Sequence, residues 1–92
     1  MTRDPAFDQE ALELFQALVR IDTTNPPGLE RAAAELLAES LRKDGLEPQL
    51  LEKLPGRTNL VARLKGDGSL PPLLLTGHLD VVGAEASRWK HP

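Results

Sequence analysis

The 92-residue chain contains no cysteine, which excludes disulfides, thiolate nucleophiles and zinc sites built on cysteine. Any metal ion would therefore have to be held by histidine and carboxylate side chains. Aromatic residues make up only 3% of the sequence, so a core would have few large side chains to fill it. A chain of this size buries only about 60 to 65% of the surface that it exposes when unfolded. We therefore expect one small domain with a marginal core.

An excess of basic residues is also missing, because 11 lysines and arginines face 14 acidic residues and the net charge is −3. This balance argues against nucleic acid and against an anionic membrane surface as partners. The longest apolar run, Leu73–Leu75 with its flanks, is far shorter than the roughly 18 residues needed to cross a bilayer. No apolar stretch follows the first five residues, so we expect no signal peptide and a cytoplasmic location.

Two amphipathic helices are predicted in the first half of the chain. Asp4 and Pro5 form a helix-start signal, and the apolar spacing that follows predicts a helix over residues 5–20. Its predicted buried stripe consists of Phe7, Leu14, Phe15 and Leu18. A second helix is expected over residues 29–43, with small residues at 32–34 that allow close packing and a stop at Asp44-Gly45. The polar, proline-rich segment 22–28 between them predicts an ordered loop.

Three strands are predicted in the second half. Residues 46–53 are expected to form a strand. Proline cannot donate a hydrogen bond to a sheet, so Pro48 places this strand at the edge of the sheet or marks the start of the strand. Residues 58–65 alternate, with Leu60, Ala62 and Leu64 on the face expected to be buried. The run 73–76 lacks polar alternation and predicts a strand covered on both faces. Such a strand needs a larger sheet, so we expect an α/β chain of two helices and about three strands that is part of a larger domain.

Residues able to support chemistry follow the third predicted strand directly, in the segment Thr76-Gly77-His78-Leu79-Asp80-Val81-Val82. In an extended chain His78 and Asp80 point to the same side, so the carboxylate can accept the proton of one imidazole nitrogen and leave the other free for a metal. An isolated His-x-Asp pair is more often a hydrogen-bonded structural histidine. The segment Thr24-Asn25-Pro26-Pro27-Gly28 likewise fits a simple helix-entry loop.

Three segments taken in order resemble a known family. They are Leu73–Val82 followed by Trp89-Lys90-His91-Pro92, the loop Asp22–Glu30, and the stretch Arg57–Ala62. The chain is similar, over nearly its whole length, to the dizinc aminoacylase and carboxypeptidase G group of metallopeptidases. This group includes acetylornithine deacetylase and succinyl-diaminopimelate desuccinylase.

The resemblance implies the following roles. His78 is a ligand of one zinc ion, and Asp80 is the catalytic acidic residue beside it that orients the imidazole. Thr24 and Asn25 border the substrate cleft. The intact enzyme holds two zinc ions, with cobalt or manganese as alternatives, acts on N-acyl amino acids or peptides, and forms a homodimer. Residues 1–92 correspond to the N-terminal portion of a three-layer catalytic domain, without the second, inserted domain, and we expect this portion to be inactive alone.

A second interpretation makes the chain a non-catalytic α/β fragment or interaction module with a vestigial metal site. The two interpretations differ in whether the gene continues past Pro92 with further carboxylates and a histidine. A third possibility, another metal hydrolase architecture, would require a second histidine within a few residues of His78, and Leu79 and Val81 leave none there.

Overall fold

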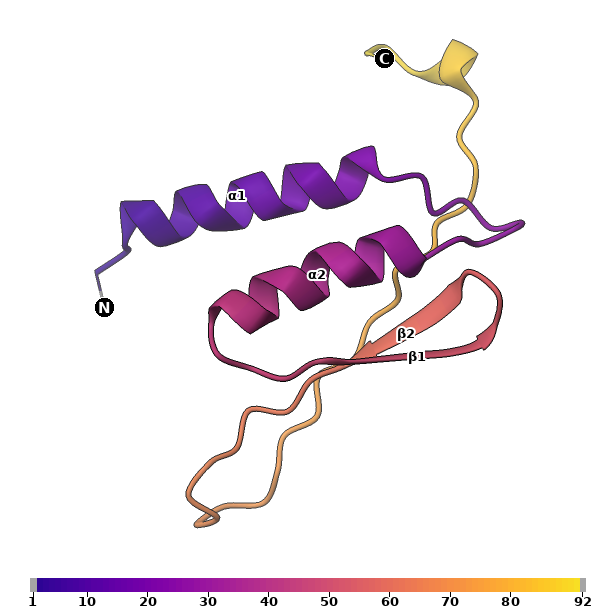
Figure 1. Cartoon of the computed structure of the whole chain (residues 1–92). Helices are drawn as coiled ribbons and strands as arrows, with labels where there is room; N and C mark the ends of the chain where they lie inside the picture. The colour runs from indigo at the N-terminus through magenta and orange to yellow at the C-terminus, as the bar shows by residue number, and fades with distance from the viewer. Residues whose placement is uncertain (1, 92) are drawn as a thin grey trace.

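The computed structural model describes residues 2–91 (Figure 1). Met1 and Pro92 lie outside the described residues. The last position of the Trp89–Pro92 segment is therefore not described. The elements are helix α1 (Pro5–Arg20), helix α2 (Arg31–Lys43), strands β1 (Gln49–Leu54) and β2 (Arg57–Val61), and a short 3-10 helix, η1 (Ala86–Arg88). The α/β class and the two helices predicted from the sequence are confirmed, with a two-stranded sheet.

Helix α1 has the predicted bounds because its start is encoded locally. The Asp4 side chain accepts a hydrogen bond from the backbone amide of Ala6 at 3.0 Å, and Pro5 occupies the first turn, where no amide hydrogen is needed. Its predicted buried stripe is wrong for Phe7 and Phe15, whose exposed fractions are 68% and 63%. Leu14 and Leu18 are half-buried. Burial fails because no surface among the described residues covers this side of the helix.

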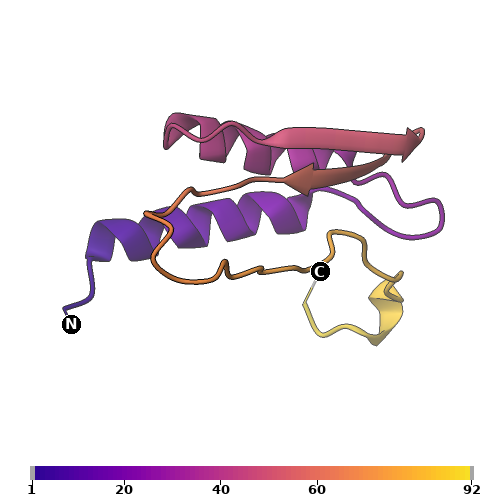
Figure 2. The same ribbon diagram turned by 90° about the horizontal axis from the view of Figure 1, so that it is seen from below.

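Helix α2 packs on the hairpin and supplies the fully buried apolar residues of the described chain, Ala33, Ala34 and Ala38. The small stripe expected at 32–34 is thus confirmed at two of its three positions, whereas Ala32 is exposed. The helix begins two residues later than predicted, at Arg31, with Glu30 at the N-cap position. The two helices run in opposite directions, with the hairpin against α2 (Figures 1 and 2).

Strands β1 and β2 form an antiparallel hairpin in which Gln49 pairs with Val61 and Glu52 pairs with Thr58. The first strand begins directly after Pro48, as the missing amide of proline predicts. The second strand is shorter than predicted and ends at Val61, because it has no partner beyond Gln49 in the described chain. Consequently Leu60 is half-buried, whereas Ala62 and Leu64, also expected inside, are exposed.

The third predicted strand, residues 73–76, is not formed. The chain leaves β2 on a long excursion away from the helices and returns without pairing along this stretch (Figures 1 and 2). Leu73, Leu74 and Leu75 are each 84% exposed. A strand requires a neighbouring chain for its backbone groups, and the described residues provide none here. Among residues 2–91, no helix has the length and apolar character to cross a membrane.

The Glu52–Thr58 pair of the hairpin makes stability depend on pH. The Thr58 hydroxyl donates to the Glu52 carboxylate, and this bond, together with Arg31, holds the pKa of Glu52 below its ordinary value. A lowered carboxylate pKa adds stability above the ordinary glutamate value of about 4.3, and this contribution disappears as the pH falls through the folded-state value.

We expect Thr58→Val to lower the free energy of unfolding at pH 6, and the difference from the wild type to shrink steadily toward pH 3. Urea unfolding followed by circular dichroism at each pH measures this difference. Thr76→Val, at an exposed threonine, serves as the control and should show no such convergence. A Thr58→Val difference that stays constant with pH would contradict the assignment.

Candidate functional site

The loop between the helices holds the segment 79–82 in place. The backbone amide of Asn25 donates to the Val81 carbonyl at 2.7 Å, and the backbone amide of Val81 donates to the Thr23 carbonyl at 3.1 Å. These two bonds form a parallel bridge. The hydroxyl of the buried Thr23 donates to the Leu79 carbonyl at 2.7 Å. The polar loop is therefore ordered, as its composition predicts, and it fixes the backbone on which His78 and Asp80 lie.

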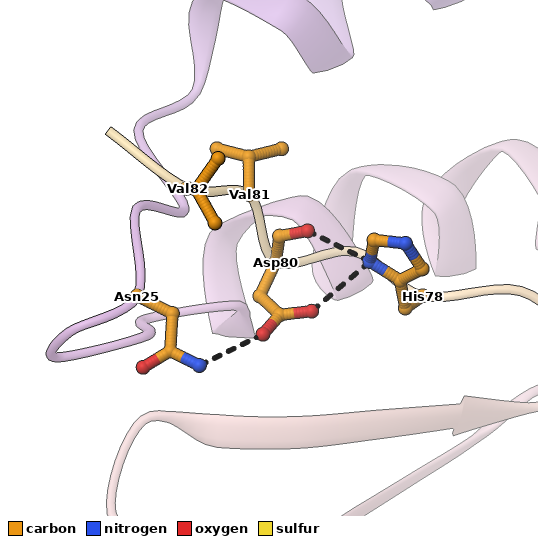
Figure 3. A pocket seen from close by; sticks show the side chains of 5 residues that line it. All are labelled: Asn25, His78, Asp80, Val81 and Val82. Carbon is orange, nitrogen blue, oxygen red and sulfur yellow. Dashed lines mark hydrogen bonds and ion pairs between the residues drawn. The ribbon is translucent and has the colours of Figure 1, made fainter. Parts of the chain in front are cut away.

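His78 and Asp80 make the contact that their spacing predicts (Figure 3). The Nδ1 atom of His78 lies 2.8 Å from the backbone oxygen of Asp80 and 3.1 Å from its Oδ1. Both partners of Nδ1 are acceptors, so in the neutral ring this nitrogen carries the hydrogen and Nε2 keeps its lone pair. The ring is 81% exposed. This is the tautomer in which imidazole binds a metal through Nε2.

The Asp80 carboxylate is held on its other oxygen by two further donors. The Asn25 side-chain amide donates to Oδ2 at 3.0 Å, and Nη2 of Arg57 lies 3.5 Å from the same atom. The Asn25 hydrogen bond first, then the His78 ring and the Arg57 charge, hold the pKa of Asp80 below its ordinary value. Asp80 is therefore an ionised acceptor at neutral pH.

Arg57 and Glu30 form an ion pair behind Asp80 that the sequence did not predict. Nε of Arg57 donates to Glu30 Oε2 at 3.0 Å, and Nη2 lies 2.9 Å from Oε1, so the contact is bidentate. The Glu30 side chain is only 7% exposed and the Arg57 side chain 37%. Both residues lie within segments that carry the family resemblance, but 27 residues separate them, and the sequence contains no signal that they meet.

A pocket of about 360 Å³ opens beside His78 and Asp80, and its other lining residues are Asn25, Val81 and Val82 (Figure 3). Of the two residues predicted to border a substrate cleft, Asn25 lies in this pocket. Thr24 does not line it. The roles of all four predicted site residues stay predictions.

The residues present fit part of a metal site. Structural and catalytic zinc ions take three or four protein ligands. Within residues 2–91 no group of three or more histidine, aspartate or glutamate side chains is placed to hold one metal ion. His78 does offer one suitable donor, since its Nδ1 is bonded to Asp80 and its Nε2 is available. The described residues therefore bring together one imidazole and one carboxylate here, and any further metal ligands would have to come from elsewhere.

Comparisons with known proteins identify the relatives of this chain. It is 35% identical to aminoacylase-1 of Mus musculus over 98% of its own length and 22% of that enzyme. It is 34% identical to succinyl-diaminopimelate desuccinylase of Methylobacterium radiotolerans, over 99% of the chain and 23% of that protein. Acetylornithine deacetylase of Vibrio campbellii is 33% identical, over 85% of the chain and 21% of its own length. No family profile and no solved structure matches.

The names of these relatives define a class of hydrolases that remove acyl groups from amines. The chain is a homologue of this aminoacylase and deacetylase family, which confirms the resemblance drawn from its motifs. It spans less than a quarter of the length of the curated relatives it matches.

Proposed function

We propose that this chain is part of the catalytic domain of a zinc-dependent hydrolase that cleaves the amide bond of N-acyl amino acids or peptides. His78 is the metal ligand and Asp80 is the carboxylate that orients it. The observation that carries the proposal is the position of His78 Nδ1 between two acceptor oxygens of Asp80, which leaves Nε2 as the metal donor. The homodimer, the cytoplasmic location and the missing second domain stay predictions.

Each residue of the site has a defined task in this proposal. Zinc, when bound, lowers the pKa of a coordinated water toward neutrality and polarises the substrate carbonyl, and cobalt or manganese are the alternatives. His78 offers its Nε2 lone pair, and Asp80 keeps the hydrogen on Nδ1 and makes the ring a better donor. Asn25 holds Asp80 ionised and lies in the pocket, where its amide borders the space for a substrate.

The ligand count favours a second candidate, a non-catalytic α/β module with a vestigial metal site. One imidazole and one carboxylate, the set that residues 2–91 bring together here, do not bind zinc tightly. The two candidates differ in whether the gene product hydrolyses N-acyl amino acids, whether or not His78 still binds a metal ion.

A zinc titration tests the role of His78. We expect zinc to shift the ring resonances of His78 in NMR spectra at lower concentration than those of His91, the other histidine, which does not line the pocket. Because outer carboxylates contribute 10- to 100-fold to metal affinity, Asp80→Asn should weaken binding about tenfold, and His78→Ala at least as much. Equal shifts at both histidines, or unchanged affinity in His78→Ala, would contradict the assignment.

The His78→Ala variant also tests the reaction in the complete gene product. Hydrolysis of an N-acetyl amino acid should stop when zinc is chelated, return when zinc is added, and be lost in His78→Ala. Zinc binding at His78 without any hydrolysis would favour the non-catalytic module.

A further inference from the structure

We propose that Arg57, held by Glu30, is a positioning residue that fixes the orientation of the Asp80 carboxylate, so that one of its oxygens faces the imidazole of His78. The inference rests on the proposed function, because it concerns the orientation of the proposed metal ligand. It gives a task to two segments of the family resemblance, the loop 22–30 and the start of β2, whose shared role the sequence does not reveal.

The two oxygens of Asp80 have different hydrogen-bond donors. Oδ1 lies 3.1 Å from His78 Nδ1, whereas Oδ2 receives the Asn25 amide at 3.0 Å and Nη2 of Arg57 at 3.5 Å. A rotation of the carboxylate about its Cβ–Cγ bond would break contacts on both oxygens at once. The two donors on Oδ2 therefore keep Oδ1 directed at the imidazole.

Arg57 is itself held in place. Its guanidinium makes two bonds to the Glu30 carboxylate, at 2.9 and 3.0 Å, and a planar fork fixed at two points has one orientation. The Glu30 backbone amide also donates to the Gly56 carbonyl at 2.9 Å. The start of α2, the hairpin turn and the site segment thus meet at this guanidinium, so the direction of Nη2 toward Asp80 is set by rigid elements.

Gly28 provides the space that the Arg57 guanidinium occupies. A Cβ atom at this position would lie 2.7 Å from Cζ of Arg57, closer than nonbonded atoms allow. Its φ of +73° also belongs to the left-handed region that favours glycine. Asn25 and Arg57 together form a clamp on the Asp80 carboxylate. The loop therefore contributes to this clamp twice, through the side-chain amide of Asn25 and through the missing side chain of Gly28.

The experiment measures the tautomer of His78 in the metal-free chain. Two-bond proton–nitrogen NMR spectra at about pH 8.5, where an ordinary imidazole is neutral, report which ring nitrogen carries the hydrogen. A His91→Gln variant assigns the signals. We expect His78 to carry its hydrogen on Nδ1 in the wild type. In Arg57→Gln the fraction with hydrogen on Nε2 should at least double, because the carboxylate can then turn away and Nδ1 keeps only the backbone oxygen of Asp80, at 2.8 Å, as a fixed acceptor.

Three further variants complete the test. Arg31→Gln is the matched control, since Arg31 pairs with Glu35 and Glu52 and does not contact Asp80, and it should leave the tautomer unchanged. Arg57→Lys keeps the charge but loses the fork, so we expect an intermediate shift. Asn25→Ala removes an exposed donor from Oδ2 and should shift the tautomer in the same direction as Arg57→Gln.

An unchanged tautomer in a folded Arg57→Gln variant would overturn the proposal and leave Arg57 a purely structural residue. If that variant does not fold, Arg57→Lys and Asn25→Ala decide the question, and no shift in either overturns it. Because no metal is needed, the outcome is independent of the zinc titration. A shifted tautomer without zinc binding supports the clamp and contradicts the metal role, whereas zinc binding with an unshifted tautomer does the reverse.

Discussion

Arg57→Gln is expected to lower the free energy of unfolding by about 2 kcal/mol, because it leaves the Glu30 carboxylate buried without its partner. Fully buried pairs lose more when one member is removed, and the half-exposed guanidinium reduces the effect here. The loss is large for this chain, since the fully buried apolar residues among positions 2–91 are three alanines and small cores supply only a few kcal/mol. Urea unfolding measures it.

Two companion variants separate an unpaired charge from lost packing. Glu30→Gln combined with Arg57→Gln removes both charges, so the double variant should be more stable than Arg57→Gln alone. Arg31→Gln removes an exposed guanidinium and should cost clearly less than Arg57→Gln does. A double variant as unstable as Arg57→Gln would show that the guanidinium acts by packing rather than by charge.

Features encoded by neighbouring residues were predictable from the sequence. The start of α1 follows from Asp4 and Pro5, and the contact between His78 and Asp80 follows from their spacing in an extended chain. Each depends on groups within two residues of one another. The burial of Phe7 and the strand at 73–76 were predicted wrongly, because burial and strand pairing need a second surface, and the described chain does not supply it.

The clamp on Asp80 was beyond sequence reasoning for the same physical reason. Asn25 is 55 residues from Asp80 and Arg57 is 23 residues from it, and no periodicity connects them. The sequence analysis predicted that Asn25 borders a substrate cleft, but it could not show that the side-chain amide bonds the Asp80 carboxylate. A buried glutamate at the end of a polar loop and an arginine at the start of a strand become informative only when their distance is known.

Gly28→Ala is expected to be the most damaging substitution in the loop, with a loss of about 3 kcal/mol in the free energy of unfolding. A side chain at φ +73° costs about 1 kcal/mol, and the new Cβ must also displace the guanidinium of Arg57 from Glu30. Gly45 isolates the first contribution, because its φ is +86° and a Cβ there would meet nothing within 4 Å.

We therefore expect Gly45→Ala to cost only about 1 kcal/mol, so that its difference from Gly28→Ala measures the displacement of Arg57. The displacement should also depend on the arginine. In an Arg57→Gln background, where the fork to Glu30 is already lost, Gly28→Ala should cost little more than Gly45→Ala does. Equal losses for Gly28→Ala with and without Arg57 would mean that the glycine serves the loop alone, and that Arg57 reaches Asp80 without help from it.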